Sequence, residues 1–140
     1  MIVGGFPYYF NLRRVIMIKI KLGELKSLVS GVNEIMGEKL PIKAAYAFTK
    51  FAKKLQKEVQ TYEENRRKLI DTYGLRDENG KLVINNGIYE IADKENFNKE
   101  FVELSDIETE IDFDPISLGA LGDISLSPLS IMALEKVIRE

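Results

Sequence analysis

The stretch IKAAYAFTKFAKKLQKEVQTYEENRRKLIDTY, residues 42–73, carries the clearest structural pattern in the chain. Its core-type positions recur at alternating intervals of four and three residues, which predicts one helix with a heptad seam. At 1.5 Å per residue such a helix is about 48 Å long. The seam consists of Phe48, Ala52, Leu55, Val59, Tyr62, Arg66, Leu69 and Tyr73.

A rod of this length needs a packing partner along its seam. That partner is either another helix of the same chain or the same helix of a second copy. Because a chain of 140 residues leaves little material to bury the whole rod, we expect a homo-oligomer formed through the seam.

Shorter elements flank the long helix. Strands are predicted where apolar residues alternate and helices where they recur every three to four residues. Asn86-Gly87 predicts a tight turn between two strands. The expected elements are a strand at 15–22, a helix at 24–36, a hairpin with strands at 81–84 and 88–91, a helix at 94–106, a strand at 107–113, a loop at 115–123 and a helix at 128–138.

The expected fold class is therefore α+β and mostly helical: one long heptad-patterned helix, a shorter helix, a β-hairpin and small flanking strands. Residues 17–140 are expected to form a single domain, with residues 1–16 as an N-terminal extension or arm. Met1 and Met17 are both possible starts of translation, and the sequence does not choose between them.

The composition argues against most catalytic chemistry. There is no histidine and no cysteine, which excludes Ser-His-Asp, Cys-His and zinc-water mechanisms. No phosphate loop or dinucleotide fingerprint is present. We therefore expect no enzyme activity, no cofactor and no metal.

The apolar N-terminus does not resemble a secretory signal, because Arg13 and Arg14 follow its apolar stretch instead of preceding it. No apolar run reaches the roughly 18 residues of a membrane span. A cytoplasmic protein with no membrane partner is the expectation.

Charge divides the chain into a basic and an acidic half. Residues 1–41 hold six basic and three acidic side chains, residues 42–73 eight and four, and residues 74–140 six and fifteen. Two explanations remain open: complementarity within or between subunits, or a basic groove for an anion. The overall charge of −2 argues against binding duplex nucleic acid.

The residues Glu108, Glu110, Asp112 and Asp114 form an acidic ladder. Neighbours two apart on a strand lie nearly 7 Å apart, which is too far to chelate one ion without a bend. The ladder is therefore interpreted as the solvated face of a strand, with a Mg²⁺ or Ca²⁺ site as the alternative.

The candidate binding residues lie in two groups. Arg66 occupies a seam position, where it needs a carboxylate from the acidic half or an anionic ligand. Tyr62, one turn earlier, and Arg67 would lie beside such a ligand. Arg13 and Arg14 follow aromatic residues in a segment that suits an arm docking into a neighbouring subunit, or a nucleotide-binding segment.

Several stretches resemble a family of short uncharacterised proteins encoded by tailed phages and prophages of Gram-positive bacteria. The resemblance covers about residues 17–138. It is carried by the stretches KLPIKAAY (39–46), YEENRRKLI (62–70), Tyr73-Gly74, FNKEF (97–101) and DPISL (114–118). It implies a phage origin and supplies no catalytic residues.

Two functions follow as hypotheses. The first is a phage accessory protein without enzyme activity, acting by self-association and by contact with a phage or host protein, in the host cytoplasm or the virion. The alternative is a counter-defence protein that sequesters a host nucleotide signal, a small anion, in a basic pocket between subunits.

Overall fold

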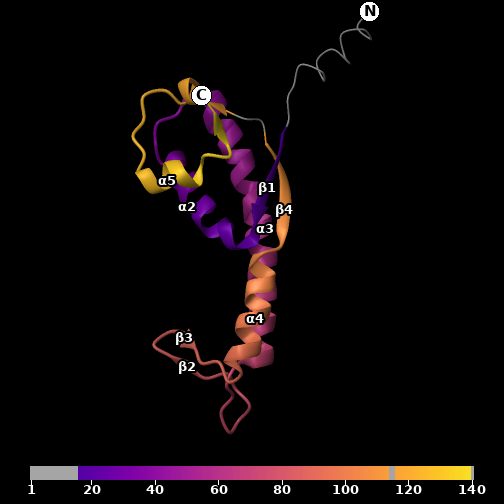
Figure 1. Ribbon diagram of the computed structural model, residues 1–140. Coiled ribbons are helices and arrows are strands. Elements are labelled where there is room, and N and C mark those ends of the chain that lie inside the picture. The colour runs from indigo at the N-terminus through magenta and orange to yellow at the C-terminus, as the bar shows by residue number, and fades with distance from the viewer. Residues whose placement is uncertain (1–15, 114–115, 140) are drawn as a thin grey trace, which may run out of the picture.

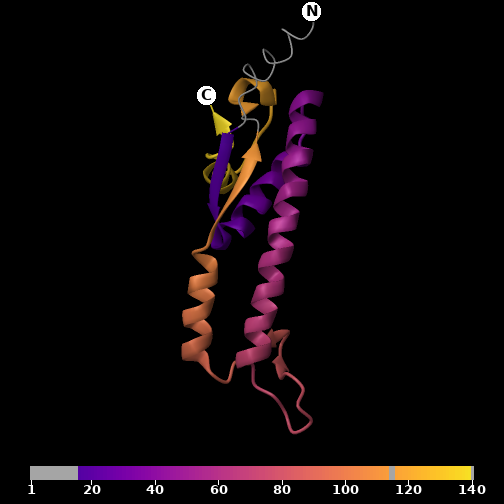
Figure 2. The ribbon, with the colours of Figure 1, turned by 90° about the vertical axis from the view of Figure 1, so that its right-hand side faces the viewer.

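The computed structural model describes residues 16–113 and 116–139. It has the expected α+β, mostly helical architecture, built around a single long helix (Figure 1). That helix, α3, spans Ile42–Tyr73, as the heptad pattern predicts at both ends. The chain forms a head around the N-terminal half of α3 and a stalk along its C-terminal half, as Figures 1 and 2 show.

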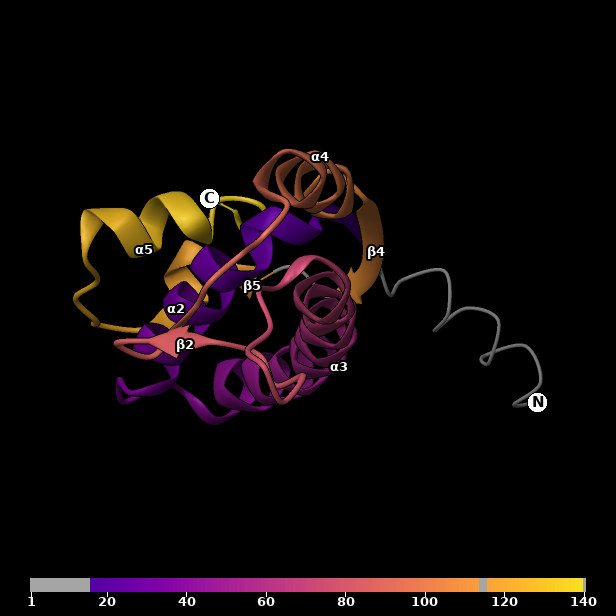
Figure 3. The same ribbon diagram turned by 90° about the horizontal axis from the view of Figure 1, so that it is seen from below.

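The head contains two antiparallel strands, β1 (Ile16–Lys21) and β4 (Glu108–Phe113), which are far apart in sequence. A 3-10 turn, η1 (Leu22–Glu24), leads from β1 into helix α2 (Leu25–Met36). Figure 3 shows α2 beside α3 when the molecule is viewed from below.

The remainder of the head is the C-terminal segment, which we define as residues 116–139. It contains β5 (Ile116–Ser117), the 3-10 turn η2 (Leu118–Leu121), helix α5 (Pro128–Ala133) and β6 (Ile138–Arg139). Strands β5 and β6 pair in parallel, and α5 packs against α2.

The stalk consists of α3 and helix α4 (Lys94–Ser105), which lie side by side (Figure 2). A small hairpin, β2 (Ile84–Asn85) and β3 (Ile88–Tyr89), lies at the tip of the stalk. The predicted turn between its strands is confirmed, because Asn86 and Gly87 both have positive φ, 53° and 78°.

One hydrophobic core fills the head. Strands β1 and β4 direct alternate side chains inward, including Ile18, Ile20, Ile111 and Phe113, which are all buried. The ring of Phe113 packs on Phe51 of α3, with a centroid separation of 4.5 Å. The two strands therefore cover the N-terminal half of α3.

The seam of α3 is internal to the chain, which undercuts the prediction that it joins two copies. Phe48 and Leu55 are buried among α2 and the two strands, and Ala52 and Val59 are half-buried against the same core. Farther along, α4 packs on α3. The chain thus supplies its own packing partner, the other option that the pattern left open.

The stalk completes this covering of the seam. Leu69 and Tyr73 are half-buried there. The carboxylate of Glu100 on α4 lies beside the Tyr73 hydroxyl and raises the pKa of that tyrosine, with help from partial desolvation. The seam residues therefore have packing partners within the chain, and self-association stays a prediction.

The last predicted helix, 128–138, is wrong at its C-terminal end. Ser127 and Pro128 begin α5 as expected, with the Ser127 hydroxyl accepting a hydrogen bond from the Ser130 backbone N–H at 3.2 Å. The helix ends at Ala133 because the chain leaves it to pair Ile138 with Ile116. The stretch predicted as a loop, 115–123, contains β5 and η2.

Candidate functional site

The predicted binding residue Tyr62 takes part in packing between the two stalk helices. Its hydroxyl lies 3.1 Å from the hydroxyl of Ser105 on α4. Its ring meets the ring of Phe101 edge-on, with a centroid separation of 6.4 Å. Tyr62 is therefore engaged inside the chain and does not present its ring to a ligand.

Arg66 is paired within its own helix, contrary to the prediction of a partner from the acidic half. Its guanidinium donates to the carboxylate of Glu63, three residues earlier, with a shortest separation of 2.9 Å. The Arg66 side chain is 37% exposed, so the seam position is a half-open one at the flank of the stalk. Arg67 is exposed, about a quarter-turn round the helix.

The structure therefore does not gather the predicted cations into a basic pocket. Tyr62 and Arg66 point into contacts of the stalk, and Arg67 lies in the exposed class. Arg13 and Arg14 lie outside the described residues.

The acidic ladder lies on the outer face of β4, as its favoured interpretation predicts. Glu108 and Glu110 stand opposite Lys21 and Lys19 of β1. The carboxylate of Asp112 accepts a hydrogen bond from the ammonium group of Lys54 at 2.9 Å, which lowers its pKa. Within the described ranges, 16–113 and 116–139, no group of three or more His, Cys, Asp or Glu is placed to hold a metal ion. Asp114 lies outside those ranges.

This pairing explains part of the charge asymmetry. Lys54 of the basic half pairs with Asp112 of the acidic half, and Lys19 and Lys21 lie opposite Glu110 and Glu108 in the strand register. Conversely, Lys136 of the acidic half lies 3.5 Å from Glu24 of the basic half. Complementarity within one subunit, one of the two explanations left open, therefore accounts for the Lys54–Asp112 pair.

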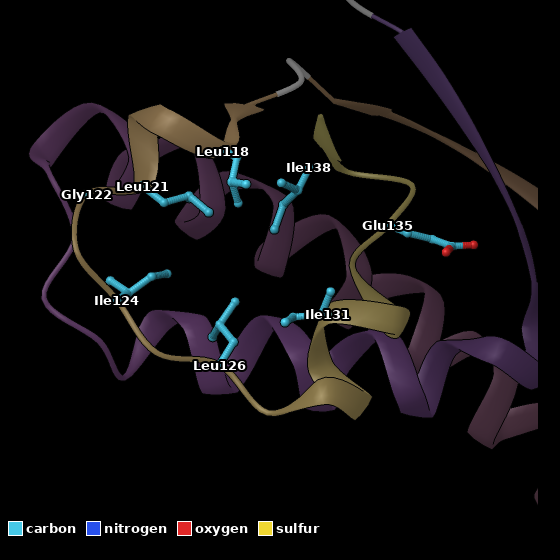
Figure 4. Close-up of a pocket in the computed structure, with 8 residues that line it drawn as sticks. All are labelled: Leu118, Leu121, Gly122, Ile124, Leu126, Ile131, Glu135 and Ile138. Carbon is cyan, nitrogen blue, oxygen red and sulfur yellow. The ribbon is translucent and has the colours of Figure 1, made fainter. Parts of the chain in front are cut away.

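An apolar pocket lies in the C-terminal segment of the head. Its volume is about 490 Å³, within the range of small-molecule and peptide sites. The side chains around it are aliphatic apart from one acid (Figure 4). The lining residues are Leu118, Leu121, Gly122, Ile124, Leu126, Ile131, Glu135 and Ile138.

Figure 4 shows the aliphatic side chains pointing toward a common centre while the Glu135 carboxylate points away from it. Leu121 is fully buried and forms the floor, whereas Leu118 and Ile131 are more than half exposed at the mouth. The pocket therefore offers apolar contact area and no charged group directed inward, which favours an apolar occupant.

Hydrogen bonds between α2 and the C-terminal segment hold one wall of the pocket in place. The Glu34 carboxylate accepts hydrogen bonds from the backbone N–H and the hydroxyl of Ser127 and from the hydroxyl of Ser130. These bonds lower the pKa of Glu34, with Ser130 contributing most. Farther along α2, Glu38 accepts from the backbone N–H of Ser125. The two carboxylates hold one wall of the pocket against α2.

Glycines let the segment approach closely. A Cβ atom added to Gly31 of α2 would lie 3.1 Å from Leu134 Cγ and 3.3 Å from Ala133 Cβ, tighter than most such contacts. Gly122 has a φ of 79°, which L-residues rarely adopt, at the bend after η2. Helix α5 can therefore pack directly on the backbone of α2.

Sequence reasoning missed this pocket. Its one available signal is a set of aliphatic residues at irregular intervals, Leu118, Leu121, Ile124 and Leu126, inside a stretch predicted to be mostly loop. Aliphatic residues without helix or strand periodicity indicate a segment folded onto a core or around a cavity.

Comparisons with known proteins do not identify the chain: no protein-family model, no curated protein and no solved structure matches it significantly. Within the described residues, none of the helices combines the length and apolar character needed to cross a membrane.

Proposed function

We propose that this protein is a non-enzymatic accessory protein that binds another protein by taking up an extended apolar segment of that partner in the pocket of the C-terminal segment. The single observation that carries the proposal is the pocket itself: about 490 Å³, aliphatic, open at its mouth, and without an inward-facing charge. Apolar side chains of a peptide segment suit such a site.

The resemblance to tailed-phage proteins is the reason to seek the partner among phage or host proteins, in the host cytoplasm or the virion. Self-association remains part of the hypothesis. Because much of the seam of α3 packs within the chain, other exposed surfaces are the better candidates for contact with a second copy.

Sequestration of a nucleotide, the alternative function, has less support. A phosphate needs donors or cations that converge on it. Arg66 is paired with Glu63, and Tyr62 contacts Ser105 and Phe101. Ultraviolet absorbance of the purified protein gives a direct check, because the chain has no tryptophan and bound nucleotide would dominate near 260 nm.

The test of the proposal is site-specific cross-linking. A photoreactive residue at Ile131, at the mouth of the pocket, should capture one partner from phage-infected cells, and mass spectrometry identifies it. Binding is then measured with the purified partner and with two variants of helix α5. Ile131→Asp should abolish binding, since it places a charge in the mouth of an apolar site.

Leu129→Asp is the matched control. Leu129 is 77% exposed on the same helix and does not line the pocket. This variant should bind the partner with unchanged affinity. Equal binding by wild type and Ile131→Asp would show that the pocket is not the contact surface.

A further inference from the structure

We propose that the outer face of α3, in the head, binds single-stranded nucleic acid. This inference goes beyond the proposed function and does not involve the apolar pocket. Three observations carry it: a row of lysines on the side of α3 opposite the core, the lack of carboxylates paired with that row, and an exposed aromatic ring within it.

The lysines and the aromatic ring stand in one straight line along the helix. They recur at intervals of three, four, three and four residues, which keeps them on one helical face. We define the basic row as Lys43, Tyr46, Lys50, Lys53 and Lys57. All five side chains are exposed. At 1.5 Å per residue the row is about 21 Å long.

The basic row lies on an open side of the head. At about 100° per residue its members project from the side of α3 opposite Phe48, which is fully buried in the core. In Figure 2, α2 and β4 both lie on one side of α3, and the helix forms an edge of the head. An extended chain can therefore lie along this face.

The row carries positive charge that the fold leaves largely uncompensated. Residues 39–57 contain six lysines and no acidic side chain. Lys54, outside the row, pairs with Asp112, and Lys50 adds a weaker attraction to the same carboxylate. Among the described residues, the four lysines of the row form none of the salt bridges. Such a stripe of one charge sign attracts a polyanion.

The row also holds a ring suited to stacking. The ring of Tyr46 is 65% exposed, and the ammonium group of Lys50 lies 5.6 Å from its centroid. This cation–π contact favours one position of the ring, while most of its area stays open to a base. Ile42, one turn earlier and 82% exposed, extends the apolar area beside it.

The arrangement favours a single strand over other anions. The lysines stand in a row instead of converging on one point, which suits a chain of phosphates better than a single phosphate. A duplex keeps its base faces inside the stack, so only a single strand offers Tyr46 a base.

Two other classes of anionic partner fit the face less well. A partner helix would need an apolar seam along the whole row, and only Ile42 and Tyr46, both at one end, are available. A membrane surface would need an apolar helix face to enter the bilayer, whereas the apolar face of α3 is buried in the core.

Fluorescence anisotropy with a labelled oligothymidine of about 12 nucleotides tests the proposal, since single-strand sites cover roughly 4–16 nucleotides. The variant is Lys50→Gln/Lys53→Gln/Lys57→Gln, which should bind about tenfold more weakly or worse at low salt. The slope of log affinity against log salt should become shallower by about two, because each phosphate contact contributes about 0.7.

The matched control removes three lysines from the stalk. Lys81→Gln/Lys94→Gln/Lys99→Gln changes the net charge by the same amount at positions that are equally exposed. This control should bind the oligonucleotide as the wild type does. Thermal melting of both triple variants checks that they are folded, which is expected because every changed side chain is exposed.

Tyr46→Ala separates stacking from charge. It should weaken binding of the oligothymidine by about fivefold or more, since stacking on one base contributes roughly that factor. It should leave the affinity for an abasic strand of the same length unchanged. The pocket variant Ile131→Asp should bind the oligothymidine like the wild type, so this inference and the proposed function fail separately.

The proposal is overturned if the wild type does not bind the oligothymidine, if the two triple variants lose affinity equally, or if a duplex of the same length binds more tightly. It is also overturned if Tyr46→Ala has no effect on the oligothymidine. Binding of phosphatidylserine vesicles or of polyglutamate in preference to the oligonucleotide would instead assign the basic row to a membrane surface or to an acidic protein.

Discussion

The carboxylate of Glu34 on α2 accepts two hydrogen bonds from Ser127, one from the backbone nitrogen at 2.6 Å and one from the hydroxyl at 3.0 Å. Ser127 is also the N-cap of α5. One carboxylate therefore fixes the beginning of the helix that forms a wall of the pocket, and it links residues 93 positions apart in the sequence.

Replacing Glu34 with glutamine should loosen the C-terminal segment while leaving the rest of the head folded. The amide keeps the size of the side chain but loses the charge that strengthens its hydrogen bonds to Ser127 and Ser130. We expect faster amide hydrogen exchange at Leu134 and Val137, whose N–H groups bond within the segment. Glu64→Gln, on the exposed outer face of α3, is the matched control and should leave these rates unchanged.

The stability of the fold should decrease in acid, because Glu34 and Asp112 form their hydrogen bonds as charged carboxylates. Hydrogen bonds lower the folded-state pKa of Glu34, and a lysine lowers that of Asp112. A carboxyl with a lowered folded pKa stabilises the fold above its unfolded pKa, and the contribution is lost as the pH falls through the folded value. We expect the free energy of unfolding to fall as the pH goes from about 5 toward about 2, with a shallower slope in Glu34→Gln. Urea titrations at a series of pH values measure this, and identical slopes would contradict it.

Leu55→Ala tests whether the heptad seam is an internal one. Leu55 is 1% exposed in the core of the head, so the truncation should lower the free energy of unfolding by about 2–5 kcal/mol. Lys53→Ala, on the exposed face of the same helix, should change it by less than about 0.5 kcal/mol. Urea unfolding gives both values. If Leu55→Ala instead leaves stability intact and dissociates an oligomer in light scattering, the seam lies between subunits.

The sequence predicts those helices and strands whose apolar residues recur regularly along the one face that packs on the core. The ends of α3 at Ile42 and Tyr73 follow because Pro41 and Gly74 flank an uninterrupted seam. The same periodicity misled at the C-terminus: Ser130, Leu134 and Val137 are buried at helical spacing, although the helix ends at Ala133. The pairing of Ile138 with Ile116 overrides this helical periodicity. The local sequence around Ile138 does not indicate that Ile116 is its partner.

The candidate sites were harder to predict than the fold. Arg66 occupies a seam position, yet its side chain stays 37% exposed and pairs with Glu63 on the same helix. The pocket depends on Glu34 and Ser127 meeting across most of the chain. Periodicity identifies which face of an element is buried, but it does not identify which distant loop folds onto that face.

Arg66→Met should change little, because its ion pair with Glu63 is more than a third exposed and such pairs contribute about 0–1 kcal/mol. We expect the free energy of unfolding to stay within about 0.5 kcal/mol of the wild type. Thermal melting with a panel of cyclic nucleotides should show no stabilisation of either protein. A ligand-induced shift in the wild type that Arg66→Met abolishes would favour the nucleotide-sequestering function instead.

Gly31→Val should separate α5 from α2. Glycine inside a helix costs roughly 1 kcal/mol relative to alanine, so its presence in α2 needs a packing reason. That reason is the approach of α5, since even a methyl group at Gly31 would press on Leu134 and Ala133. The two further methyl groups of valine should destabilise the fold by about 1–3 kcal/mol and speed hydrogen exchange at Leu134. Ser30→Val carries the same β-branched side chain at an exposed position of α2 and should leave that exchange unchanged. Equal exchange in the two variants would mean that α5 does not need the close approach to α2, and that the wall of the pocket is held by the Glu34 hydrogen bonds alone.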